Sequence, residues 1–180
     1  MDKKGVVPAL LGRVYKEKGR SAAFREHCQF ITDLYLLFKS VAKEEKSTLH
    51  FSTKTQLEEY RIFPDPLPDA YLVLKKRGRK RRRYFLEVIS EQIPRFVLRG
   101  RIEYLVEYFD SQEWQKNTGE PFPMILVVCP NPVTQKFLSR FIRKTLESEG
   151  SDISFYLTTS DQIKTRGIQL DIWQEVENVD

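Results

Sequence analysis

The chain has 180 residues, and its 30 Lys and Arg against 25 Asp and Glu give a formal net charge of +5. With 41% hydrophobic and 12% aromatic residues it can bury a core, which excludes a wholly disordered chain. Two cysteines are too few for a disulfide scaffold and indicate a reducing, cytoplasmic location. No apolar run is long enough for a membrane span or a signal peptide, so no membrane partner is expected.

The positive charge is concentrated in one segment. Residues 75–83 read KKRGRKRRR, and without them acidic residues outnumber basic ones in the rest of the chain. A uniformly basic, histone-like protein is therefore excluded. The sequence instead predicts a slightly acidic body that carries one strongly basic patch.

The first half of the chain predicts an arm, a helix and three strands. Residues 1–21, with spaced Gly and one Pro, are expected to form an N-terminal arm. A stripe of apolar residues at helical spacing predicts a long helix over 22–46. A short strand is expected over 48–53, and strands over 69–75 and 83–90 should pair as a β-hairpin that turns at Gly78.

The second half alternates helices and strands. A helix is expected after Pro94, and the apolar run 123–129 predicts a strand covered on both faces. Asn131 as N-cap and Pro132 at the first helical position predict another helix, which should end at Gly150. Strands are expected over 153–159 and, as a last edge strand, over 168–173.

This order predicts an α/β fold with a mixed central sheet flanked by helices. The sequence of elements is helix, strand, β-hairpin, helix, strand, helix, strand, with an antiparallel first half and a βαβ-like second half. We expect a single domain over residues 22–175, with the basic segment 75–83 at the tip of its hairpin.

The hairpin brings two carboxylates together. If the turn centres on Gly78, Asp69 lies opposite Glu87, and Glu87 shares a face with Phe85 and Ile89. Two carboxylates facing each other are electrostatically poor unless a cation lies between them. Hard oxygen ligands in this arrangement suit Mg²⁺ or Mn²⁺.

At these residues the chain resembles the PD-(D/E)XK nucleases, and more closely the replication-relaxation family of plasmid and mobile-element proteins, which is related to some mobilisation relaxases. The resemblance covers roughly residues 22–160. It is carried by Arg25-Glu26-His27 at the start of the long helix, the segments PDAYL (68–72) and YFLEV (84–88), Arg101-Ile102 with Tyr104 and Tyr108, and Phe122-Pro123 before the apolar strand.

The resemblance implies a restriction-endonuclease-like fold that acts on DNA in plasmid or mobile-element replication or mobilisation. Asp69 and Glu87 would hold Mg²⁺ or Mn²⁺ for metal-dependent DNA nicking. Arg101 would stabilise developing charge. Glu26 and His27 are candidate accessory residues, and so is Tyr108, because other relaxases use a tyrosine nucleophile. Other replication or mobilisation proteins are possible partners.

The chain departs from the family in two ways. Ile89 occupies the third motif position, where Lys is usual, which favours a catalytically degenerate, DNA-binding accessory protein as the alternative to an active enzyme. The family commonly carries a winged-helix region before the nuclease-like part, and only about twenty residues precede it here. We expect that module to be absent or to lie on another chain.

Each candidate residue also has a purely structural interpretation. Asp69, which follows Pro68, could form an Asx turn. Glu87 could lie at an edge or form a salt bridge, although strands disfavour Glu. His27 lies on the apolar stripe of its helix, which is typical of a hydrogen-bonded core histidine.

The basic segment also leaves alternatives open. It could be a solvated hairpin tip, a nuclear-localisation-like string, a contact for an acidic protein partner, or a contact for nucleic acid. Like charges at one tip repel each other, so we expect sequence-independent contacts to DNA phosphates. The residues expected to make them are Lys75, Lys76, Arg77, Arg79, Lys80, Arg81, Arg82 and Arg83.

Overall fold

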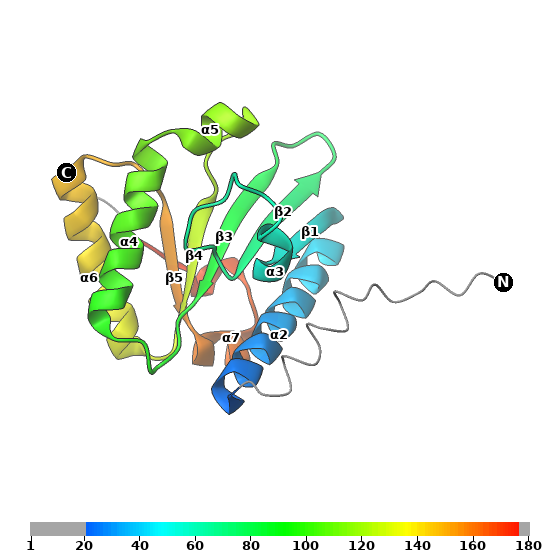
Figure 1. Ribbon diagram of the computed structural model, residues 1–180. Coiled ribbons are helices and arrows are strands. Elements are labelled where there is room, and N and C mark those ends of the chain that lie inside the picture. The colour runs from blue at the N-terminus through cyan, green and yellow to red at the C-terminus, as the bar shows by residue number, and fades with distance from the viewer. Residues whose placement is uncertain (1–20, 177–180) are drawn as a thin grey trace, which may run out of the picture.

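Six strands form one mixed sheet in the spatial order β1-β2-β3-β4-β5-β6 (Figure 1). The computed structural model describes residues 21–176. β1 to β3 are antiparallel neighbours, β3 to β5 are parallel, and β6 pairs antiparallel with β5. The strands are β1 (Ser47–Thr53), β2 (Ala70–Lys76), β3 (Arg82–Val88), β4 (Met124–Cys129), β5 (Phe155–Thr159) and β6 (Gln174–Glu175).

Helices cover both faces of this sheet (Figure 1). One buried cluster joins the sheet to α4, α5 and α6, and a second joins its other face to α2 and α7. The helices are α2 (Ala22–Glu44), α3 (Lys54–Leu57), α4 (Arg95–Asp110), α5 (Glu113–Thr118), α6 (Pro132–Glu149), α7 (Ser160–Arg166) and the 3₁₀ helix η1 (Leu170–Ile172). The predicted α/β class, with an antiparallel hairpin and a parallel second half, is therefore confirmed.

The boundaries of α6 follow from its end residues. The Asn131 side chain accepts a hydrogen bond of 2.9 Å from the backbone N–H of Thr134, and Pro132 starts the helix with its fixed φ. Gly150 ends the helix at a φ of +63°, a conformation that glycine adopts without steric cost. The predicted N-cap and C-terminus of this helix are both confirmed.

β3 alternates between the two cores. Phe85 belongs to the cluster under α4 and α6, whereas Leu86 and Val88 belong to the cluster under α2. Phe85 also makes edge contacts with the rings of Trp114 and Phe122. Truncation of such a buried ring to Ala costs about 3–5 kcal/mol. This alternation directs Glu87 to the same side of the sheet as Phe85.

The end of the chain differs from the prediction. The edge strand expected over 168–173 is wrong, since the chain forms η1 there and pairs with β5 only at Gln174 and Glu175. Ile168 and Ile172 are both buried in the cluster under α2. A spacing of four places two residues on one face of a strand as well as of a helix, so this pattern alone could not distinguish the two.

Two further findings concern the chain as a whole. The predicted arm, residues 1–21, lies outside the described residues except for Ser21, whose hydroxyl accepts a hydrogen bond of 3.2 Å from the backbone N–H of Phe24 at the start of α2. Within residues 21–176, no helix has the length and apolar character to cross a membrane.

Candidate functional site

Three charged residues lie in one row across β1, β2 and β3. The strand register pairs Thr53 with Ala70 and Ala70 with Leu86. One residue beyond these pairs, Lys54 lies beside Asp69, and Asp69 lies beside Glu87. The backbone N–H of Lys54 donates to the carbonyl of Asp69 over 2.9 Å, which holds this end of the row together. The predicted placement of Asp69 opposite Glu87 agrees with this register.

Arg101 binds both carboxylate oxygens of Glu87. Its Nε and one terminal nitrogen each donate a hydrogen bond of 2.6 Å, and that terminal nitrogen also donates to the Leu67 carbonyl over 2.8 Å. Glu87 is only 4% exposed. Burial raises the pKa of Glu87 to about 7, and the Arg101 guanidinium opposes this shift by stabilising the charged form. The salt-bridged interpretation of Glu87 is therefore correct.

Asp69 is held by α2 and β3. One carboxylate oxygen lies 3.1 Å from His27 Nε2, and the other accepts a hydrogen bond of 2.8 Å from the backbone N–H of Val88. The hydrogen bond to Asp69 raises the pKa of His27, while burial opposes it. The core-histidine interpretation is wrong, because the His27 side chain is 28% exposed. The Asx-turn interpretation of Asp69 fails too, because its side chain bonds to a distant strand.

These residues line one cavity of about 730 Å³. It lies between the N-terminal part of α2 and the first half of α4. Its charged residues are His27, Lys54, Asp69, Glu87 and Arg101, and the rest of the lining is mostly apolar. The structure thus brings together the two predicted carboxylates, the predicted arginine and one predicted accessory residue.

The other two accessory candidates lie elsewhere. Glu26 is exposed and does not line the cavity. Tyr108 is buried in the core under α4, where its hydroxyl donates a hydrogen bond of 2.6 Å to the Ile62 carbonyl. Burial raises the pKa of Tyr108 to about 12, so this hydroxyl is a poor nucleophile. Tyr104 does line the cavity, and its hydroxyl accepts a hydrogen bond of 3.1 Å from the N–H of Asp65.

In this arrangement both carboxylates are held by protein groups. Both oxygens of Glu87 accept from Arg101, and both oxygens of Asp69 have partners. Within the described part of the chain, no group of three or more His, Cys, Asp or Glu side chains gathers, whereas Mg²⁺ is commonly held by one or two carboxylates together with water and substrate phosphates. The cation beside Glu87 is the Arg101 guanidinium, and His27 lies against Asp69.

Lys54 is the residue that the sequence-based prediction missed. It follows β1 directly, lines the cavity, and its positive charge lowers the pKa of both Glu87 and His27. A signal was present, because an antiparallel pairing of the strands over 48–53 and 69–75 can set Lys54 opposite Asp69. The hairpin alone did not reveal that pairing.

The basic segment is only partly available for binding. Arg83 is 8% exposed and pairs with Glu120, which also pairs with Arg81 over 3.3 Å. Arg82 pairs with Glu45. Of the eight cations expected to contact DNA, the last three therefore have carboxylate partners in the fold. The residues left at the turn are Lys75, Lys76, Arg77, Arg79 and Lys80, all of them exposed except Lys76, which is half-buried.

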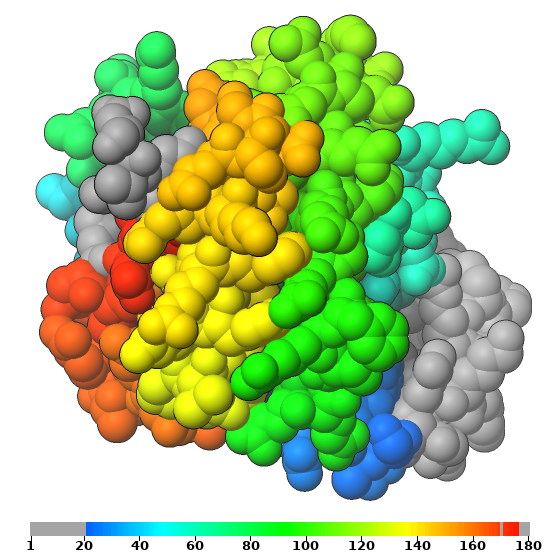
Figure 2. All heavy atoms as spheres, turned by 90° about the vertical axis from the view of Figure 1, so that its left-hand side faces the viewer, coloured from blue at the N-terminus to red at the C-terminus, as the bar shows by residue number. Residues whose placement is uncertain are grey.

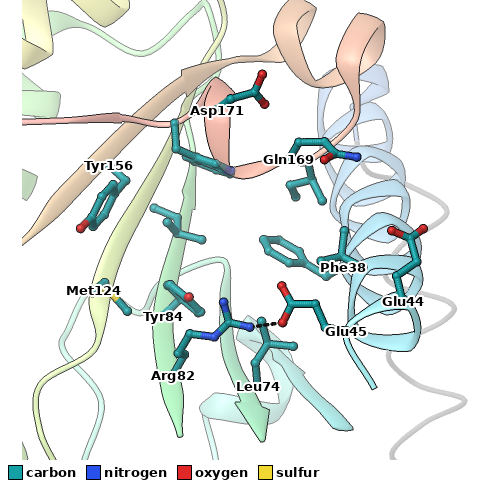
Figure 3. A pocket seen from close by; sticks show the side chains of 14 residues that line it. Phe38, Glu44, Glu45, Leu74, Arg82, Tyr84, Met124, Tyr156, Gln169 and Asp171 are labelled. Atoms are coloured by element: carbon teal, nitrogen blue, oxygen red, sulfur yellow. Dashed lines mark hydrogen bonds and ion pairs between the residues drawn. The ribbon is translucent and has the colours of Figure 1, made fainter. Parts of the chain in front are cut away.

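A second cavity, of about 620 Å³, lies on the opposite face of the sheet (Figure 3). Phe38 of α2, Tyr84 of β3 and Tyr156 of β5 point into it, and the Arg82–Glu45 ion pair crosses its edge. Its lining is mainly apolar and separate from the row of Lys54, Asp69 and Glu87.

No family model, curated protein or solved structure matches this chain. The candidate site is therefore described from its own residues and their geometry.

Proposed function

We propose that this protein binds DNA without cleaving it, as an accessory protein of plasmid or mobile-element replication or mobilisation in the cytoplasm. The mixed sheet with helices on both faces is compatible with a restriction-endonuclease-like scaffold. The replication role rests on the resemblance given above. The exposed cations at the β2–β3 turn support sequence-independent contacts to phosphates.

One observation carries the non-cleaving part of the proposal. The Glu87 carboxylate is buried and both of its oxygens are bound by Arg101. Charge-assisted, bidentate pairs of this kind are strong and geometrically specific. A divalent cation would have to displace the guanidinium before Glu87 could bind it. Ile89 stands where the resembling nucleases usually have Lys, and this also supports a protein that binds DNA without cleaving it.

Metal-dependent nicking, with Mg²⁺ or Mn²⁺ as cofactor, is the second candidate. Lys54 favours it, because this residue supplies a cation in the same cavity as Asp69 and Glu87. A lysine from a neighbouring strand end could replace the one that is missing at position 89. This candidate requires Arg101 to leave Glu87 when DNA binds.

Two assays on the full chain separate the candidates. Binding of a fluorescent DNA duplex is measured in EDTA, and supercoiled plasmid is incubated with the protein in Mg²⁺ and in Mn²⁺. The proposal predicts binding in EDTA, weakened steeply by salt, and plasmid that stays supercoiled.

The matched control carries Asp69→Asn and Glu87→Gln, which keep the side-chain shapes. Nicking by the wild type that disappears in this variant would establish the second candidate. Failure of the wild type to bind duplex DNA would overturn both candidates.

A further inference from the structure

A second basic surface lies in a groove between α4 and α6. The two helices are side by side on the face that Figure 2 presents, α4 in green and α6 in yellow. The groove has a volume of about 430 Å³. Its lining combines five exposed cations with three apolar side chains and contains no carboxylate: Arg95, Arg99, Lys136, Arg140, Lys144, Val133, Phe137 and Phe141.

Two stacked rings fix the arginines of α4. The rings of Phe137 and Phe141 are nearly parallel, with centroids 6.4 Å apart. The Arg95 guanidinium lies 4.8 Å from the Phe137 centroid, and that of Arg99 lies 5.6 Å and 5.4 Å from the two centroids. Such cation–π contacts hold the guanidinium groups in place, so less side-chain freedom is lost when an anion binds.

The groove cations differ from the last arginines of the basic segment. Among residues 21–176, none of the five groove cations forms an ion pair with a carboxylate, whereas Arg81, Arg82 and Arg83 all do. Like charges this close repel each other unless an anion lies among them. The groove therefore carries positive charge that no carboxylate of the described residues neutralises by an ion pair.

The groove and the candidate site lie on different sides of the same part of α4. Arg99 lines the groove, and its neighbours Gly100 and Arg101 line the cavity that holds Asp69 and Glu87. The hairpin tip is much further away, because strands rise about 3.3 Å per residue and Gly78 is therefore about 30 Å from Glu87. Of the two basic surfaces, the groove is the one that shares a helix with the site.

We propose that the α4–α6 groove binds the phosphate backbone of duplex DNA and sets it beside the Asp69–Glu87 cavity, while the hairpin tip provides a distant second contact. This inference rests on the proposed DNA-binding function. Lys136, Arg140 and Lys144 are four residues apart on α6, so they are about 6 Å apart along the helix axis. That row spans the phosphates of roughly three or four base pairs on one strand.

The surface favours a duplex over single-stranded nucleic acid. The rings of Phe137 and Phe141 are half-buried and covered by guanidinium groups, so they offer no open face for a base. The groove therefore offers positive charge for a phosphate backbone but no exposed ring on which a base could stack.

The test compares two triple variants of the full chain. The groove variant carries Lys136→Gln, Arg140→Gln and Lys144→Gln, and the control carries Lys39→Gln, Lys43→Gln and Lys164→Gln on exposed positions of α2 and α7. Gln has a helix propensity close to that of Lys and Arg, so both variants should fold, which thermal unfolding checks. The readout is the affinity for a 20-base-pair duplex over a range of KCl concentrations.

We expect the slope of log affinity against log salt to shrink by about 2.7 in the groove variant, which is about 0.9 for each lost phosphate contact. The control should keep the slope of the wild type. The inference is overturned if the wild type binds DNA and the groove variant binds with the same slope. It is also overturned if polyglutamate displaces the duplex as well as unlabelled duplex does at equal charge, because the groove would then suit an acidic protein. Failure of the wild type itself to bind would instead refute the proposed function.

Discussion

Glu87 of β3 and Arg101 of α4 form a bidentate ion pair with two hydrogen bonds of 2.6 Å. The pair explains how a carboxylate can lie on an otherwise apolar face of a central strand. Arg101 offsets part of the cost of burying Glu87, although burial still raises the pKa of Glu87 to about 7.

Removal of Arg101 should destabilise the protein in a pH-dependent way. Arg101→Met leaves the buried Glu87 without its partner, and we expect a loss of about 3–5 kcal/mol at pH 8. A carboxyl whose pKa is higher in the folded state than in the unfolded state loses stability as the pH rises between the two values. The loss should therefore be smaller at pH 5. Urea unfolding at both pH values measures it.

The double variant Arg101→Met and Glu87→Met is the control for this prediction. It removes both charges, so it should regain most of the stability that the single variant loses. A single variant within about 1 kcal/mol of the wild type at pH 8 would contradict the importance assigned to the pair.

The His27–Asp69 contact predicts the opposite dependence on pH. The pKa of His27 is raised by its hydrogen bond to Asp69, so protonated His27 stabilises the folded state below the ordinary value of 6.5. This stabilisation is lost as the pH rises through the raised pKa. We expect His27→Gln to cost about 1–2 kcal/mol at pH 5.5 and much less at pH 9. The same cost at both pH values would show that the histidine is not charged in this contact.

The basic segment should divide into a structural part and a binding part. Arg83→Gln removes a buried ion-pair partner of Glu120, and because Glu120 is partly exposed we expect a modest loss of about 1 kcal/mol. Arg77→Gln with Arg79→Gln should leave the thermal midpoint unchanged and lower the salt slope of DNA binding by about 1.8. An unchanged slope in this double variant would show that the hairpin tip does not contact DNA.

The start of α6 offers a test of the fold alone. Asn131→Ala removes the acceptor for the Thr134 N–H and should cost about 1 kcal/mol in urea unfolding. Asn131→Asp keeps an acceptor at this position and should cost little. Equal losses in the two variants would mean that the cap hydrogen bond does not carry the effect.

Much of this site could be predicted from local patterns, and the remainder depends on long-range packing. Alternation along β3 fixed the face of Glu87, and the turn at Gly78 fixed its alignment with Asp69. Arg101 was expected near them, but the rotation of α4 that makes its contact bidentate depends on how the helix packs on the sheet. Lys54 joins the site only through the pairing of β1 with β2.

The behaviour of the basic segment also depends on long-range packing that local patterns do not reveal. Its composition predicted one uniform patch, because the partners of its last three arginines are far away in the sequence. Glu45 lies at the end of α2 and Glu120 lies in the loop before β4. The groove between α4 and α6 could not be predicted from the sequence either, because its cations are spaced along two separate helices and form no basic run.

The most direct test of the central claim is a crystal structure of the full chain with duplex DNA and Mn²⁺, with anomalous scattering used to locate the metal. The account predicts DNA along the α4–α6 groove, an intact Glu87–Arg101 pair and no manganese peak between Asp69 and Glu87. A manganese ion bound to both carboxylates, with Arg101 turned away from Glu87, would contradict it and establish a metal-dependent centre.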